Sequence, residues 1–128
     1  GGVVRVCVRA LRGLEALDGP PAGGLLDPRV AVRLGGEERI TPPVCYSADP
    51  TWSSGNAFSF HVGGARPASQ LELEVLNTQP GAEVLVGTAG LDLAAVPRGQ
   101  WSTCWRPLGP CRGELLLSVC LEAALGAA

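Results

Sequence analysis

The amino-acid sequence predicts an all-β protein, an eight-stranded antiparallel β-sandwich built from two sheets. Three observations favour this fold class. Five runs of residues alternate between apolar and polar side chains, which is typical of strands buried on one face. Clusters rich in Gly and Pro separate these runs. Helical periodicity is nearly absent, because only "LDLAAVP" indicates a helical turn, which Pro97 would end.

The five alternating runs are distributed along the whole chain. In order they read "VVRVCVRA", "PRVAVRLG", "AFSFHV", "QLELEVL" and "ELLLSVCLEA". Each places its larger apolar residues on one face, where we expect them to form the core. These residues are Val4, Val6 and Val8; Val30, Val32 and Leu34; Phe58, Phe60 and Val62; Leu71, Leu73 and Val75; and Leu115, Leu117, Val119 and Leu121.

Length and composition limit the classes of protein that fit. The 128 residues suit one domain, 1–128, with a core over residues 3–122 and the start of a linker at 123–128. A net charge of −2 argues against a nucleic-acid partner, which needs a basic surface. No apolar run approaches the ~18 residues of a membrane-spanning helix. The chain begins "GGVVRV" and contains no Met, so we expect it to belong to a longer protein.

Four separated signatures resemble those of one known family. They are Asp27-Pro28-x-Val30, Asp49-Pro50-x-Trp52, Phe58-x-Phe60 and Leu85-Val86-Gly87. In this order they resemble the C2 domain, the sandwich that docks signalling and trafficking proteins onto membranes or other proteins. The resemblance covers nearly the whole chain, from Val3 to about Glu122. It implies the type II topology, in which the first and last strands are neighbours.

The segment "DPTWSSGNAFSF" holds three of the six aromatic residues of the chain. The resemblance implies an architectural role. Pro50 would preset the turn, Trp52 would cover the end of the sandwich, and Phe58 and Phe60 would fill the core. Asp49 stands where the family usually has Asn, and either side chain can bond the local backbone. The alternative is that Trp52 is a tip that inserts into a membrane.

The resemblance also locates the calcium site of the family, and this sequence departs from it. Calcium binds 6–8 oxygen atoms, mostly from carboxylates. The first loop retains Asp18 and Asp27, but the third-loop positions are Asn77 and Gln79, and Glu83 is the nearest acid there. Because amides carry no charge, we expect no calcium and no other cofactor or metal. The two Asp then serve as a turn residue and as the entry to a strand.

Candidate contact residues for a partner lie in the first loop and near the second and third strands. Leu25 and Leu26 could enter a membrane or pack inward, and Arg33 and Arg39 could bind anionic headgroups. Two Glu lie between these Arg, so any basic patch is thin. With Trp52, these residues are the candidate contact set for a protein partner or an anionic phospholipid membrane.

The five Cys leave the redox state open. In the type II topology Cys7 and Cys120 lie on neighbouring strands, so a disulfide can form if they are in register. Cys104 and Cys111 could meet across a turn, which would leave Cys45 unpaired. The odd count and the cytosolic location of most C2 domains favour reduced thiols.

An enzymatic function finds no support in the sequence. His61 is the only His, it lies in an expected strand, and no motif supplies a nucleophile with an oriented base. The sequence therefore predicts a calcium-independent docking domain of a larger trafficking or signalling protein, cytoplasmic and peripheral to membranes. The alternatives are a phospholipid-binding domain with weak or residual calcium dependence, and a secreted domain stabilised by disulfides.

Overall fold

The computed structural model describes residues 2–14, 27–44, 49–63, 69–79, 81–110 and 113–123. These residues form eight strands and one short 3-10 helix. The strands are β1 (Gly2–Arg12), β2 (Pro28–Leu34), β3 (Glu37–Ile40), β4 (Ala57–Val62), β5 (Gln70–Gln79), β6 (Ala82–Asp92), β7 (Trp101–Pro107) and β8 (Glu114–Ala123). The 3-10 helix η1 (Leu93–Ala95) is the turn predicted before Pro97. Within the described ranges, no helix is long and apolar enough to cross a membrane.

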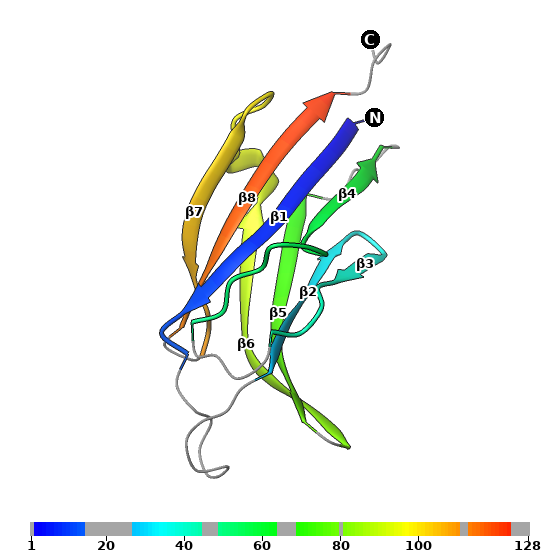
Figure 1. Ribbon diagram of the computed structural model, residues 1–128. Helices are drawn as coiled ribbons and strands as arrows, with labels where there is room; N and C mark the ends of the chain where they lie inside the picture. Colours follow the sequence, from blue (N-terminus) through cyan, green and yellow to red (C-terminus); the bar gives the residue numbers. More distant parts are fainter. Residues whose placement is uncertain are drawn as a thin grey trace.

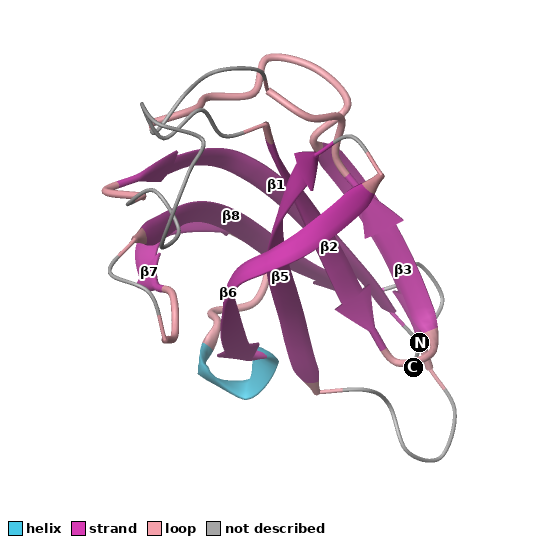
Figure 2. Ribbon diagram, turned by 90° about the horizontal axis from the view of Figure 1, so that it is seen from below, coloured by secondary structure: helices cyan, strands magenta, loops and turns pink. Residues whose placement is uncertain are grey.

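The eight strands form two antiparallel sheets, which confirms the predicted sandwich. Sheet A has the order β4-β1-β8-β7, and sheet B has the order β3-β2-β5-β6. Figure 1 and Figure 2 show the two layers curving over one another. The first and last strands, β1 and β8, pair along their length, as the type II topology requires. The two termini consequently lie at the same end of the sandwich.

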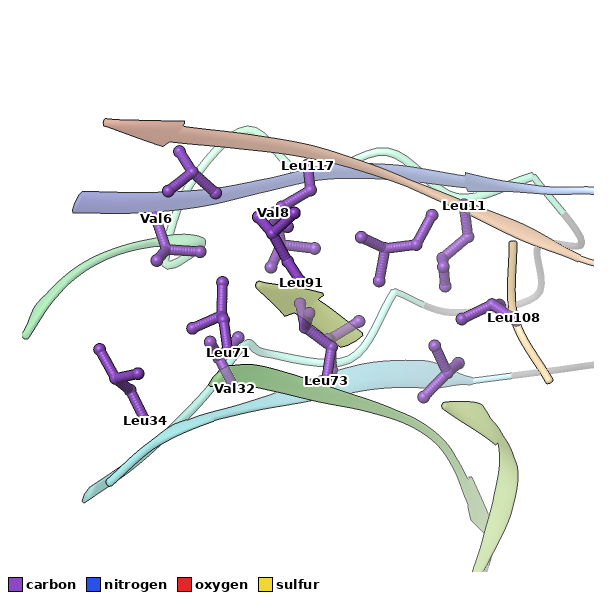
Figure 3. Close-up of a cluster of buried hydrophobic side chains, with 14 of the residues drawn as sticks. Val6, Val8, Leu11, Val32, Leu34, Leu71, Leu73, Leu91, Leu108 and Leu117 are labelled. Carbon is purple, nitrogen blue, oxygen red and sulfur yellow. The ribbon is translucent and has the colours of Figure 1, made fainter. Parts of the chain in front are cut away.

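The core lies between the sheets and contains most of the alternating residues that the sequence singles out, together with others such as Leu11, Leu91 and Leu108 (Figure 3). Phe58, Val62 and Leu121 are only partly buried and pack against it. Strands β1, β2, β5 and β8 supply most of it, because each has neighbours on both edges. Val8, Val32, Leu71 and Leu115 are fully buried. Each such side chain stabilises the fold by about 1.5–3 kcal/mol relative to an exposed one. The outer face of each sheet points away from this core.

The segment containing Trp52 packs along β1 and has an architectural role. Trp52 is 8% exposed, and its indole N–H donates to the Pro42 carbonyl at 2.7 Å. Its main-chain N–H donates to the Arg9 carbonyl at 3.0 Å. The burial of the indole favours the architectural role over the alternative that Trp52 contacts a membrane or a partner. Asp49 accepts a hydrogen bond from the distant Gly13 N–H at 2.8 Å, a contact that the local interpretation did not foresee.

Candidate functional site

Strands β5 and β6 close the region that the sequence indicates as the third loop. Asn77 pairs with Val84 inside the antiparallel ladder, and the last pair is Gln79 with Ala82. The turn between this last pair is short, and Gly81 within it has a φ of 75° that favours glycine. The expected loop is thus a tight hairpin, which projects at the end of the sandwich opposite the termini (Figure 1).

Asn77 fastens this hairpin to the start of β2. The residue is 1% exposed, and its Oδ1 accepts a hydrogen bond from the Asp27 main-chain N–H at 2.8 Å. The Thr78 N–H donates to the Asp27 carbonyl at 3.1 Å. A neutral amide therefore joins two segments at positions where the resemblance implies calcium ligands.

An ion pair that the sequence reasoning missed joins β2 to the same hairpin. The Arg29 guanidinium donates two hydrogen bonds to the Glu83 carboxylate, at 2.6 and 2.7 Å. These bonds lower the pKa of Glu83, although desolvation opposes the change, and they raise the pKa of Arg29. The two residues are 54 positions apart, so only the register across β5 could have revealed the pair.

The described residues at this end do not form a recognisable metal centre. Among them, no group of three or more His, Cys, Asp or Glu residues is placed to hold an ion. Asp18, Leu25 and Leu26 lie outside the described residues, as does the side chain of Gln79. Their roles therefore stay predictions.

Arg33 and Arg39 do not form a shared basic patch. Arg33 pairs with Glu38, whereas Arg39 pairs with the buried Val32, so the two Arg point to opposite faces of sheet B. The Arg39 guanidinium lies 5.0 Å from the ring centre of Phe60. Any contact with an anionic surface would have to use them separately.

The outer face of sheet B is rich in ion pairs. Arg29 bonds Glu83, and Arg33 forms salt bridges with Glu38 and Glu74. Both Arg on this face thus have carboxylate partners. Glu72, which pairs with Arg33 in the ladder, adds a further negative charge. A face with four Glu and two Arg repels anionic headgroups more than it attracts them.

Exposed apolar side chains mark the β5–β6 hairpin. Val84 is 37% exposed and Leu85 is 48% exposed. The sequence motif that contains Leu85 indicates the family, but it predicts neither residue as a contact. Both residues lie in β6 near the hairpin turn, where Val84 pairs with Asn77 and Leu85 with Leu76.

The outer face of sheet A carries two of the three Trp, which the sequence reasoning did not single out. Trp101 is 52% exposed, and Trp105 is half-buried beneath Arg12, whose guanidinium carbon lies 3.8 Å from the ring centre. Arg9 reaches across this face to Ser118, with its Nε donating to Oγ at 2.6 Å. Aromatic and cationic groups therefore lie together on the outer face of sheet A, which points away from the core.

The Cys7–Cys120 disulfide considered from the sequence is not formed. Cys7 pairs with Ser118, whereas Cys120 pairs with Arg5, so the two thiols are two residues out of register. Cys7, Cys104 and Cys120 are all free. Cys45 and Cys111 lie outside the described residues.

Similarity to solved structures supports the fold. A C2 domain of plant extended synaptotagmin 1 superposes with a TM-score of 0.81 at 24% identity, covering 96% of this chain and 95% of that one. A calcium-bound structure of two C2 domains of extended synaptotagmin 2 gives a TM-score of 0.76 at 23% identity, covering 95% of this chain and 45% of that one.

Similarity in sequence gives the family. Mouse multiple C2 and transmembrane domain-containing protein 2 is 30% identical over 105 residues, which cover 81% of this chain and 12% of that protein. Human extended synaptotagmin-1 is 28% identical over 119 residues, which cover 91% of this chain and 10% of that protein. The chain thus spans about a tenth of the length of these relatives. The C2 domain family model matches residues 2–108, and the chain belongs to the C2 domain family.

Proposed function

We propose that this C2 domain is a calcium-independent docking domain of a larger trafficking or signalling protein. The observation that carries the proposal is the contact between Asn77 and Asp27. At 2.8 Å and with Asn77 buried, this hydrogen bond holds the hairpin to β2 without any ion. This bond therefore joins the two described segments through a neutral amide, at positions where the family places calcium ligands.

The oxygen atoms at this end do not fit calcium. Calcium needs several carboxylates to balance its charge. The Asn77 amide oxygen is neutral and already accepts a hydrogen bond, and the Glu83 carboxylate is occupied by the Arg29 guanidinium. An arginine beside the site also repels a divalent cation. Asp27 is the other described carboxylate at these positions, and one carboxylate is too few to balance the ion.

A binding role fits the described residues better than a catalytic one. His61 is exposed on β4, where it pairs with Val3, and no nucleophile accompanies it in the described contacts. The outer faces of the two sheets, by contrast, offer ordered polar and aromatic groups. We therefore assign the domain to docking, in the cytoplasm and at the periphery of membranes.

A protein partner is favoured over an anionic membrane for the outer face of sheet B. There, Arg29 and Arg33 are engaged by carboxylates, so phosphate groups would have to displace internal ion pairs. Exposed ion pairs are weak, about 0–1 kcal/mol each, but the surplus of Glu on this face stays after they break. Binding to anionic lipids through this face is thus opposed by charge.

The second candidate function is phospholipid binding with weak or residual calcium dependence. Val84 and Leu85 favour it, because both are exposed on the projecting hairpin. Two small apolar residues alone give marginal attachment, since stable membrane binding usually needs two signals. One of the relatives is named as containing transmembrane domains, which would hold such a C2 domain near a bilayer.

Calcium titration calorimetry, combined with liposome flotation, tests the proposal. We expect no heat of binding at calcium concentrations up to about 100 µM, and flotation that does not change between calcium and chelator. Micromolar calcium binding would overturn the proposal. Flotation that increases with calcium, and that is lost in Leu85→Ser and kept in the matched control Arg33→Gln, would favour the second candidate.

A further inference from the structure

The outer face of sheet A has a central cation without an acidic partner among the described residues. Arg5 pairs with Glu122 and Arg12 pairs with Glu114, both at 3.0 Å. Arg9 lies between them along β1, and its described side-chain bond goes to the neutral hydroxyl of Ser118. The two ends of the face are thus balanced in charge, whereas its centre is positive.

Arg9 is held in place by groups that do not neutralise it. Ser118 is fully buried although it lies on the outer face, and its Oγ is 2.7 Å from the Thr103 hydroxyl. The buried Ser118 hydroxyl, itself bonded to the exposed Thr103, accepts from the Arg9 Nε at 2.6 Å. The other N–H groups of the guanidinium have no partner among the described residues, and they form the planar fork that matches a carboxylate.

A β-bulge presents this side chain. The register of β1 on β8 shifts between Val8 and Ala10, so Arg9 is the extra residue of the ladder. Its carbonyl accepts from the Trp52 main-chain N–H at 3.0 Å, which ties the bulge to the segment of the buried indole. Bulges commonly re-aim a side chain next to a functional site. The backbone geometry of the bulge thus sets the position of Arg9.

Apolar groups lie on both sides of Arg9 along the strands. In one direction, Trp105 pairs with Leu116, and in the other, Trp101 pairs with Cys120. Residues 116, 118 and 120 of β8 are successive outward positions, about 7 Å apart. The face therefore repeats in the order apolar, cationic, apolar, with the spacing of alternate residues in an extended chain.

We infer that this face binds an extended peptide segment of a partner protein with the pattern apolar-x-acidic-x-apolar. The carboxylate would pair with Arg9, one apolar side chain would lie over Trp101, and the other would pack beside the Trp105 ring, whose face Arg12 covers. A peptide fits better than a bilayer, because Glu114 and Glu122 pair with Arg12 and Arg5 and leave Arg9 as a single surplus cation. One cation can pair with one carboxylate, whereas docking on anionic lipid needs a cluster of basic residues. This inference rests on the proposed docking function and names its partner class.

Selection from a display library of random twelve-residue peptides against the 128-residue chain tests the inference. We expect enriched peptides to carry Asp or Glu two positions from apolar residues. Synthetic copies should bind Arg9→Gln and Trp101→Ser roughly tenfold more weakly than the parent domain. Glu37→Gln and Ile40→Ser, matched controls at exposed residues of β3 in sheet B, should change the Kd by less than about twofold.

Several results would overturn the inference. They are the absence of enriched peptides, enrichment of basic or purely apolar peptides, and equal loss of affinity in the sheet B controls. Flotation with phosphatidylserine vesicles that depends on Arg9 would assign the face to lipid instead. Circular dichroism would show whether the Arg9→Gln variant folds. If it does not, the peptide affinity of the Trp101→Ser variant still tests the inference, because the Trp101 side chain is half-exposed and its loss should not unfold the domain. Calcium titration does not test this face. A negative peptide selection would therefore overturn the peptide-binding inference without overturning the proposal of calcium independence.

Discussion

Replacing Asn77 with Ala should destabilise the domain measurably. The change removes the Oδ1 acceptor of the Asp27 N–H, a bond of 2.8 Å at a residue that is 1% exposed. A partly buried donor left without its acceptor costs about 1–3 kcal/mol. For a domain of this size, that loss corresponds to a decrease in Tm of about 4–12 °C. Substitution of an ordinary surface residue changes stability by only about 0.5 kcal/mol.

Urea unfolding followed by tryptophan fluorescence would measure this loss, because Trp52 is buried in the folded state. Thr78→Val is the matched control. Its hydroxyl is buried and has no hydrogen-bond partner among the described residues, so its removal should be neutral or slightly stabilising. A decrease below about 0.5 kcal/mol for Asn77→Ala would refute the assignment of Asn77 as the fastener of the hairpin.

Asn77→Asp separates the hydrogen bond from the charge. The carboxylate can still accept from Asp27, but burial disfavours its ionised form and raises its pKa in the folded state. The variant should therefore approach the stability of the parent below the unfolded-state pKa and lose stability as the pH rises. Calcium should not restore it at neutral pH. Restoration by calcium at micromolar concentration would show that this end still holds an ion site.

Three further changes test other parts of the structure. Trp52→Phe, which removes the indole N–H donor, should cost about 1–3 kcal/mol in urea unfolding, and an unchanged midpoint would contradict the buried indole contact. In Glu83→Gln, the ion pair with Arg29 is lost. Because the pKa of Glu83 is lowered in the folded state, the stability difference from the parent should be present above the ordinary value of 4.5 and vanish as the pH falls through the lowered pKa; a difference that grows towards acidic pH would be the wrong sign. Under native conditions a maleimide should alkylate the exposed Cys104 well before the buried Cys120, and mass spectrometry that finds the reverse order would contradict the described burial.

The strands that the sequence predicts best are those with a buried face and two neighbours. In β1, β2, β5 and β8 the alternate residues are almost fully buried, so the period of two is visible in the sequence. Strands β3, β6 and β7 lie at sheet edges. Their exposed side chains need not alternate, as the charged "EERI" of β3 illustrates. These three edge strands therefore leave only isolated signals in the sequence, such as "LVG", whereas the edge strand β4 still alternates in "AFSFHV".

The parts of the candidate site that the sequence could not supply depend on register. The sequence shows Asn77 as a neutral residue at a ligand position, but its bond to Asp27 joins residues 50 positions apart. The Arg29–Glu83 pair and the offset between Cys7 and Cys120 also follow from strand alignment. Alternation fixes which face a side chain occupies, but it does not fix which residue lies opposite on another strand.

The distribution of charge shows why the net charge of −2 could not locate a binding face. Ion pairing across strands balances the ends of sheet A and leaves sheet B with a surplus of Glu, so the average conceals two different surfaces. A bound carboxylate must displace the existing partner of a paired Arg, but at Arg9 it meets a neutral hydroxyl. Binding of an acidic segment is thus selective for the position on sheet A where no described ion pair competes.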